Sequence, residues 1–175
     1  MASEPAIEPL PTPNFEPGRE GLSPRAIVVH TTAGTWDGTV AWFADPSSGV
    51  SSHYLVGLDG RVAAFVAEGD TARHAGRVSE PTARIIRESD LNPNSFTIGI
   101  EFEDGGLPLD ARRPPAQYDA GARLIASAAM TWGIPIDREH VIGHREVYSR
   151  KECPGNLDVG RLVAEAAALA ASLRS

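Results

Sequence analysis

Short apolar segments rich in β-branched residues constrain this fold most, because their period and length are typical of buried strands. "RAIVVH" (25–30) and "HVIGH" (140–144) are two such runs, and each ends at a histidine, His30 and His144. "FTIGIEFE" (96–103) alternates instead. It places Ile98, Ile100 and Phe102 on one face of a strand and Thr97, Gly99 and Glu101 on the other.

Helical spacing separates these strand-like runs. Apolar residues recur at helical intervals in three stretches: Trp36, Val40 and Phe43; Leu124, Ile125, Ala128, Ala129 and Trp132; and the run from Val159 to Leu173. An Asp59-Gly60 pair between two further strand-like runs predicts a β-hairpin. Residues 67–95 are polar and irregular and indicate a long surface excursion. The interspersed pattern predicts an α/β fold, a single domain with a central mixed β-sheet flanked by helices.

Composition excludes several classes of protein. A chain of 175 residues suits one domain, and its one cysteine cannot form an internal disulfide. The net charge of −7 argues against nucleic-acid binding, which needs clustered Lys and Arg. The apolar runs are far shorter than the about 20 residues that span a bilayer, so we expect no membrane insertion. The N-terminus lacks the pattern of a secretory signal, and we expect synthesis in the cytoplasm.

Residues 1–22 form a segment of different composition, with five prolines and four glutamates. Proline cannot donate a backbone hydrogen bond, so we expect this segment neither to pair in a sheet nor to continue a helix. It is predicted to be an extended arm. A mobile tail is the favoured interpretation, and the alternatives are an arm that drapes over the domain and the remnant of a linker. We expect residues 23–175 to form the folded domain.

Three residues could together hold a metal ion. Catalytic zinc usually takes three protein ligands from His, Cys or carboxylate groups. His30 and His144 end predicted strands, and Cys153 precedes a Pro-Gly turn. Taken singly, each histidine is more often structural and a lone cysteine is usually an inert buried residue. The chain also lacks HExxH and CxxC patterns, so the metal interpretation depends on the three residues acting together.

Other polar residues accompany this set. Glu101 lies within an apolar strand beside small residues, so it is either a functional carboxylate or an outward-facing, solvated one. Lys151 precedes Cys153 by two positions and could offer positive charge to a developing oxyanion, although a solvated loop lysine is the default. His74 could contact a substrate or merely cap a turn. His53 and His140 are interpreted as structural residues or as residues that support the ligands from behind.

Five segments in one order resemble the type 2 N-acetylmuramoyl-L-alanine amidases, which include phage endolysins, cell-wall recycling amidases and peptidoglycan-recognition proteins. The segments are "IVVHTTAG", "VSSHYLVGLDGRV", "TARHAG", "NSFTIGIEFE" and "VIGHREVYSRKECPG". The resemblance covers roughly residues 24–172. It implies a Zn²⁺ hydrolase that cleaves the amide bond between N-acetylmuramic acid and the L-alanine of the stem peptide, with the zinc in a surface groove at the strand ends.

The resemblance also implies residue roles. His30, His144 and Cys153 match the zinc ligands, Glu101 matches the glutamate that activates water, and Lys151 matches the lysine that stabilises the oxyanion. His74 and Arg73 lie in the segment expected to contact substrate.

This chain departs from the family pattern at two positions. Ser52 replaces a tyrosine that assists catalysis in many members, and Tyr54 should point to the opposite face of its strand. Arg73 stands where the family often has tryptophan.

The expected partner is peptidoglycan or a soluble muropeptide, bound by a monomer. The expected setting is either the cell wall after release during phage lysis or recycled muropeptides in the cytoplasm. The alternative function is a non-catalytic module that binds peptidoglycan. Such modules typically lose the third metal ligand, and its retention here favours an enzyme.

Overall fold

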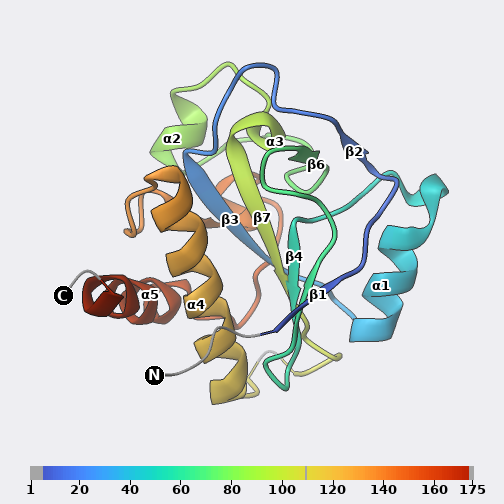
Figure 1. Ribbon diagram of the computed structural model, residues 1–175, viewed down its shortest axis with the longest axis vertical. Helices are drawn as coiled ribbons and strands as arrows, with labels where there is room; N and C mark the ends of the chain where they lie inside the picture. The colour runs from blue at the N-terminus through green and yellow to red at the C-terminus, as the bar shows by residue number, and fades with distance from the viewer. Residues whose placement is uncertain (1–5, 109, 174–175) are drawn as a thin grey trace.

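A six-stranded mixed sheet forms the centre of the protein in a computed structural model that describes residues 6–108 and 110–173 (Figure 1). The strand order is β1-β5-β4-β7-β3-β8. Its strands are β1 (Ile7–Pro9), β3 (Ala26–Thr31), β4 (Tyr54–Val56), β5 (Val62–Ala64), β7 (Thr97–Phe102) and β8 (Val141–Gly143). Strand β3 pairs in parallel with both β7 and β8, and β4 pairs in parallel with β7 and antiparallel with β5. The predicted mixed sheet is confirmed.

Helices cover both faces of this sheet. On one face, α4 (Pro115–Trp132) and α5 (Val159–Leu173) pack against alternate residues of the central strands, including Ile27 and Ile100. The opposite face carries α1 (Trp36–Ala44) and α2 (Arg84–Arg87), which contribute to two smaller apolar clusters. Figure 1 shows α1 on the side away from α4 and α5. The three predicted helical segments are therefore confirmed.

Short elements complete the domain. The hairpin around Asp59 and Gly60 joins β4 to β5 as predicted, with Val56 opposite Val62. The excursion over residues 67–95 is less irregular than expected. It contains β6 (Thr71–Ala72), α2 and part of α3 (Pro93–Phe96). Two 3₁₀ turns, η1 (Pro46–Ser48) and η2 (His144–Glu146), follow α1 and β8.

The N-terminal arm does pair in sheets, so the prediction that it cannot is wrong. Its first five residues lie outside the described part of the chain. Strand β1 pairs in parallel with β5 at the edge of the main sheet, and β2 (Phe15–Glu16) pairs antiparallel with β6. Proline is tolerated in edge strands, where its missing N–H can face away from the partner strand. Of these interpretations, the extended arm that drapes over the domain is the one observed for residues 6–22.

Buried polar side chains fasten the arm. The amide of Asn14 donates to the carbonyl groups of Phe43 and Asp45 at the end of α1, at 3.0 and 2.8 Å. Arg19 is only 4% exposed. Its guanidinium donates to the backbone carbonyl groups of Glu68, Asn94, Ser95 and Thr97. Burial lowers the pKa of Arg19 to about 10, which still leaves it charged at neutral pH.

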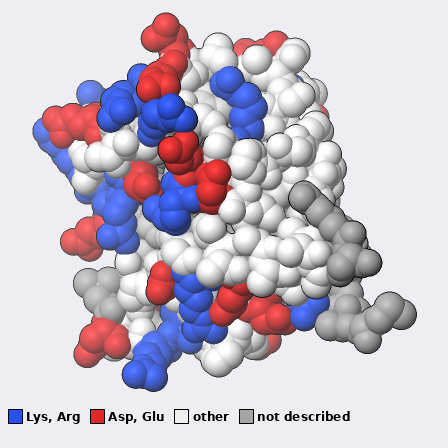
Figure 2. All heavy atoms as spheres, turned by 90° about the vertical axis from the view of Figure 1, so that its left-hand side faces the viewer, with Lys and Arg blue, Asp and Glu red and all other residues white. Residues whose placement is uncertain are grey.

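Acidic and basic side chains interleave on the face that Figure 2 presents, which is the left-hand side of Figure 1. No single charge dominates this face. Elsewhere in the structure, ion pairs within the helices join Arg123 to Asp119 in α4 and Arg161 to Glu165 in α5. Among the described residues, no helix combines the length and apolarity needed to cross a bilayer.

We expect Arg19→Met to lower the free energy of unfolding by about 2–4 kcal/mol, because buried carbonyl groups lose their charged donor. Chemical denaturation measures the effect. Arg87→Ala is the control, since Arg87 is exposed, and it should change the stability by no more than about 0.5 kcal/mol. Equal stability of the Arg19 variant and the unmodified protein would show that the arm is not anchored in this way.

Candidate metal centre

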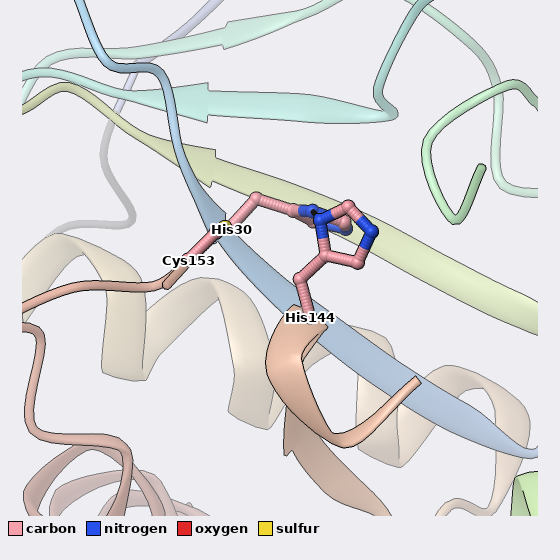
Figure 3. Close-up of side chains that lie close together, drawn as sticks. All are labelled: His30, His144 and Cys153. Carbon is pink, nitrogen blue, oxygen red and sulfur yellow. Dashed lines mark hydrogen bonds between the residues drawn. The ribbon is translucent and has the colours of Figure 1, made fainter. Parts of the chain in front are cut away.

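Parallel pairing of β3 with β7 and β8 brings the chemically active residues together. His30 near the end of β3 lies directly opposite Glu101 of β7 in the register. His144 begins η2 immediately after β8. Cys153 lies in the loop before α5 and is joined to Pro154 by a cis peptide bond. Figure 3 shows the side chains of His30, His144 and Cys153 converging from these three elements.

The three side chains fit a zinc ion. Their potential ligand atoms all lie within 4.8 Å of one another, and the Nδ1 atoms of His30 and His144 are 3.1 Å apart. His144 Nε2 lies 3.1 Å from the carbonyl oxygen of Ala75, which can only accept, so this nitrogen carries the proton and Nδ1 has the free lone pair. Two nitrogens and a sulfur are the donor set that zinc takes in sites with an open position.

The loop that carries Cys153 is held tightly. The backbone N–H of Thr31 donates to the sulfur of Cys153 at 3.2 Å. A side chain at Gly143 would meet the Pro154 ring at 2.7 Å, so only glycine lets the loop pack this closely on β8. Arg113 donates to Asn156 at 2.7 Å and to the carbonyl oxygen of Glu103 at 2.9 Å, which joins the loop to the end of β7.

The pKa of Cys153 favours a ligand over a nucleophile. Burial, with a smaller contribution from Glu101, raises the pKa of this thiol to about 12. A nucleophilic cysteine needs the opposite shift, toward the thiolate at neutral pH. A thiol with a raised pKa becomes a thiolate when a metal cation displaces its proton. The cysteine is therefore suited to hold a cation and poorly suited to attack a carbonyl group.

The neighbouring histidines are neutral. Burial is the largest cause that lowers the pKa of His30 well below its ordinary value, and the nearby His144 and His74 lower it further. Burial also lowers the pKa of His144, followed by the charge of Lys151. Because only the neutral imidazole offers a lone pair, these shifts keep both side chains ready to bind a metal at neutral pH.

The carboxyl group of Glu101 is not fully satisfied by hydrogen bonds. Its Oε2 is buried and has no hydrogen-bond partner among the described residues. Burial, followed by the charge of Asp104, raises the pKa of this carboxyl group to about 8. The carboxyl group lines the same cavity as the three candidate metal ligands. Of the two interpretations of Glu101, the inward-facing carboxylate is the one observed, and its raised pKa makes it a competent proton acceptor.

The candidate metal centre opens into a cavity of about 900 Å³. Its lining includes Thr39, Trp42 and Phe43 of α1 and, from the segment after β8, Tyr148 and Lys151. Trp42 is 55% exposed although it is a large aromatic residue. The sequence-based reasoning missed Trp42. Its position off the Trp36–Val40–Phe43 stripe was a signal, because an aromatic residue off the buried face of a helix must face solvent or a ligand.

The remaining predicted site residues have distinct environments. Lys151 is exposed at the cavity rim. Ser52 is buried and donates to the Gly99 carbonyl at 2.7 Å, while the Tyr54 hydroxyl donates to Glu68 at 2.9 Å. Tyr54 is absent from the cavity lining, in agreement with the expected opposite face. His53 is fully buried and accepts a hydrogen bond from the Gly99 backbone N–H, which suits its structural interpretation.

Arg73 and His74 both line the cavity, but they differ in accessibility. Arg73 pairs with Glu16 of the arm at 2.9 Å. His74 is only 8% exposed and its Nδ1 lies 3.0 Å from Nε2 of His30. Their contact with substrate stays a prediction.

Comparison with known proteins identifies the family. A family model described as N-acetylmuramoyl-L-alanine amidase matches residues 20–156, and this chain belongs to that family. N-acetylmuramoyl-L-alanine amidase A of Achromobacter lyticus is 34% identical over 111 residues, which are 62% of this chain and 53% of the relative. The chain therefore spans about half the length of this curated relative.

Solved structures share the fold. A selenomethionine derivative of AmpD superposes with a TM-score of 0.73 at 24% identity, covering 94% of this chain and 96% of AmpD. A mutant endolysin from Bacillus subtilis gives 0.69 at 21% identity, covering 93% and 99%. AmiD from E. coli, an N-acetylmuramyl-L-alanine amidase, gives 0.67 at 28% identity, covering 83% of this chain and 59% of AmiD. The resemblance inferred from the five segments is confirmed.

We expect Glu101→Gln to stabilise the zinc-free protein at pH 8 and to have little effect near pH 4. A carboxyl group whose folded pKa is raised to about 8 contributes stability below its ordinary pKa of 4.5, and that contribution is lost as the pH rises toward 8. Thermal unfolding at both pH values, in a chelator, measures the difference. Glu8→Gln is an exposed control and should show no such gain. A melting temperature that the Glu101 change leaves untouched at pH 8 would contradict the inferred burial cost.

Proposed function

We propose that this chain is a zinc-dependent peptidoglycan amidase that cleaves the bond between N-acetylmuramic acid and the L-alanine of the stem peptide. One observation carries the proposal. Three potential zinc ligands and a carboxylate with a buried, unpartnered oxygen share one open cavity. Membership of the amidase family supplies the bond that such a site would hydrolyse.

The ligands in this proposal are His30, His144 and Cys153. Zinc bound by such a set lowers the pKa of a water molecule toward about 7 and polarises a carbonyl group. An open metal site of this kind has three protein ligands, whereas a structural site is usually closed by four. The set found here therefore supports a catalytic rather than a structural metal.

Glu101 is the proposed general base. Its carboxylate faces the cavity and would accept the proton of the attacking water, then return it to the leaving amine. Ser52 is buried and bonded to the backbone, so it offers no substitute for the tyrosine found in many relatives. The proton transfer then falls to Glu101.

Lys151 is the proposed oxyanion group. It lines the cavity from the loop that carries Cys153, two residues away. Its ammonium group would compensate the negative charge that develops on the carbonyl oxygen of the scissile amide. This is the role the family resemblance implies for it.

The cavity suits a large amphipathic substrate. Apolar surface from Trp42, Phe43 and Val50 lines one side, whereas Arg73, Arg77 and Lys151 supply positive charge. AmiD was solved with the substrate anhydro-N-acetylmuramic acid-L-Ala-D-γ-Glu-L-Lys. A sugar joined to a peptide with free carboxylates matches both features. We extend this proposal to a monomer that acts on wall peptidoglycan or on soluble muropeptides. Its catalytic domain comprises residues 23–175, and the arm adds strands β1 and β2 to it.

The first test concerns the metal. Purified protein should hold about one zinc ion per chain and release stem peptides from murein, and Cys153→Ala and His30→Ala should lose both properties. Metal analysis and mass spectrometry of the released products measure them. His140→Ala is the matched control, because His140 bonds to Asp137 and is absent from the cavity lining. Full hydrolysis by a metal-stripped sample would exclude the proposed chemistry.

A second test separates catalysis from metal binding. Glu101→Gln should keep the zinc and lose activity by about 10²–10⁴-fold, because proton transfer is lost while the ligands remain. Zinc content and the rate of peptide release from sacculi and from soluble anhydro-muropeptides give the answer. If this variant binds murein but the unmodified protein releases nothing from either substrate, the chain is a binding module instead.

A further inference from the structure

His74 lies behind His30, a proposed metal ligand, and is almost completely buried. Its Nδ1 lies 3.0 Å from His30 Nε2, the nitrogen that faces away from the metal centre. On the other side of its ring, Nε2 lies 3.2 Å from Thr97 Oγ1. The Thr97 hydroxyl in turn donates to the carbonyl oxygen of Pro93 at 2.7 Å. His30, His74 and Thr97 thus form a continuous chain of hydrogen bonds.

The hydrogen bond from Thr97 to the Pro93 carbonyl group fixes the donor and the acceptor of every other hydrogen bond in this chain. A carbonyl oxygen can only accept, so the Thr97 proton points to Pro93 and the Thr97 oxygen must accept from His74 Nε2–H. A neutral His74 then has its lone pair on Nδ1 and accepts from His30 Nε2–H. His30 is left with its lone pair on Nδ1, which faces His144 Nδ1 at 3.1 Å.

Local packing holds His74 in this place. A side chain at Gly99 would meet the His74 ring at 2.3 Å, so the absence of one on β7 creates the space that the ring fills. Asn94 Oδ1 accepts from the backbone N–H groups of His74 and Ala75, at 3.1 and 2.8 Å. The carbonyl oxygen of Ala75 accepts from His144 Nε2. One short segment therefore lies behind both histidine ligands.

We propose that His74, with Thr97 behind it, is a positioning residue that holds His30 in the tautomer and ring orientation required for metal binding. The inference rests on the proposed function, because it takes His30 as a ligand. It gives His74 a role that needs no contact with substrate. Partners that bond the second nitrogen of a metal-binding histidine typically contribute 10–100-fold to metal affinity.

The test is zinc affinity, measured by competition with a chromophoric chelator, together with the absorption spectrum of the Co²⁺-substituted protein. His74→Leu removes the acceptor for His30 and should weaken zinc binding about 10–100-fold and alter the Co²⁺ spectrum. His74→Gln should recover part of the affinity, because its amide oxygen can accept from His30 Nε2–H. His140→Gln is the control histidine, and it should bind zinc like the unmodified protein.

Thr97 provides a milder pair of variants. Thr97→Val keeps the volume but removes the acceptor for His74, and it should weaken zinc binding as His74→Leu does. Thr97→Ser keeps the hydroxyl group and should bind zinc like the unmodified protein. This pair decides the matter if His74→Leu does not fold. Gly99→Ala should weaken binding as well, because it displaces the His74 ring.

Folded His74→Leu or Thr97→Val protein with unchanged zinc affinity and an unchanged Co²⁺ spectrum would overturn the inference. The proposed function would survive that result if the unmodified protein still binds zinc and hydrolyses murein. Failure of the unmodified protein to take up zinc would instead overturn the proposed function and the inference with it.

Discussion

The parallel pairing of β3 with β7 and β8 is the constraint on which the rest of this structure depends. It aligns the carboxyl ends of three strands at one edge, so that His30 lies opposite Glu101 and His144 follows from the adjacent strand. A rigid sheet fixes the positions of its side chains more precisely than a loop does. Cys153, the candidate ligand that lies in a loop, is held by the backbone of Thr31 and by the packing of Pro154 on Gly143.

The buried polar groups at this edge of the sheet lower the stability of the fold. A well-packed interior leaves few polar atoms without a partner, yet the Glu101 carboxyl group has a buried oxygen with none. The neutral histidines His30, His74 and His144 lie close together, and their lowered pKa values mean that protonating any of them costs free energy. The large apolar cluster beneath α4 and α5, on the other face of the same strands, offsets these costs. One face of β3 and β7 therefore packs the main apolar core, and the other face carries His30 and Glu101 of the candidate site.

The outer parts of the chain support the site from a distance. Arg19 of the arm reaches the carbonyl group of Thr97, and Thr97 also bonds to His74. Glu16 pairs with Arg73 at the edge of the cavity. The arm and the 67–95 excursion are thus connected to the residues behind the metal centre. Neither supplies a ligand in the proposed set, but the excursion also contributes Arg73 and Arg77 to the cavity lining.

Much of the fold and of the candidate site could be predicted from the sequence, because both depend on local patterns. Alternation along 96–103 predicted which side chains of β7 face the core, and the five ordered segments indicated the family. The ligand set that they imply stays a prediction, although the structure brings its three residues together. The hairpin at Asp59-Gly60 and the three helices followed from turn chemistry and spacing.

Only the tertiary structure decided the features that need partners distant in the chain. The arm pairs with β5 and β6 although its prolines argued against pairing, since an edge position tolerates what a central strand does not. His74 is separated from His30 by 44 positions, and no local pattern says that its ring fills the space above Gly99. The sequence by itself determined which residues could act and which faces they share, because periodicity is local. Distances, tautomers and pKa values arise from burial and neighbours, which exist only once the chain has folded.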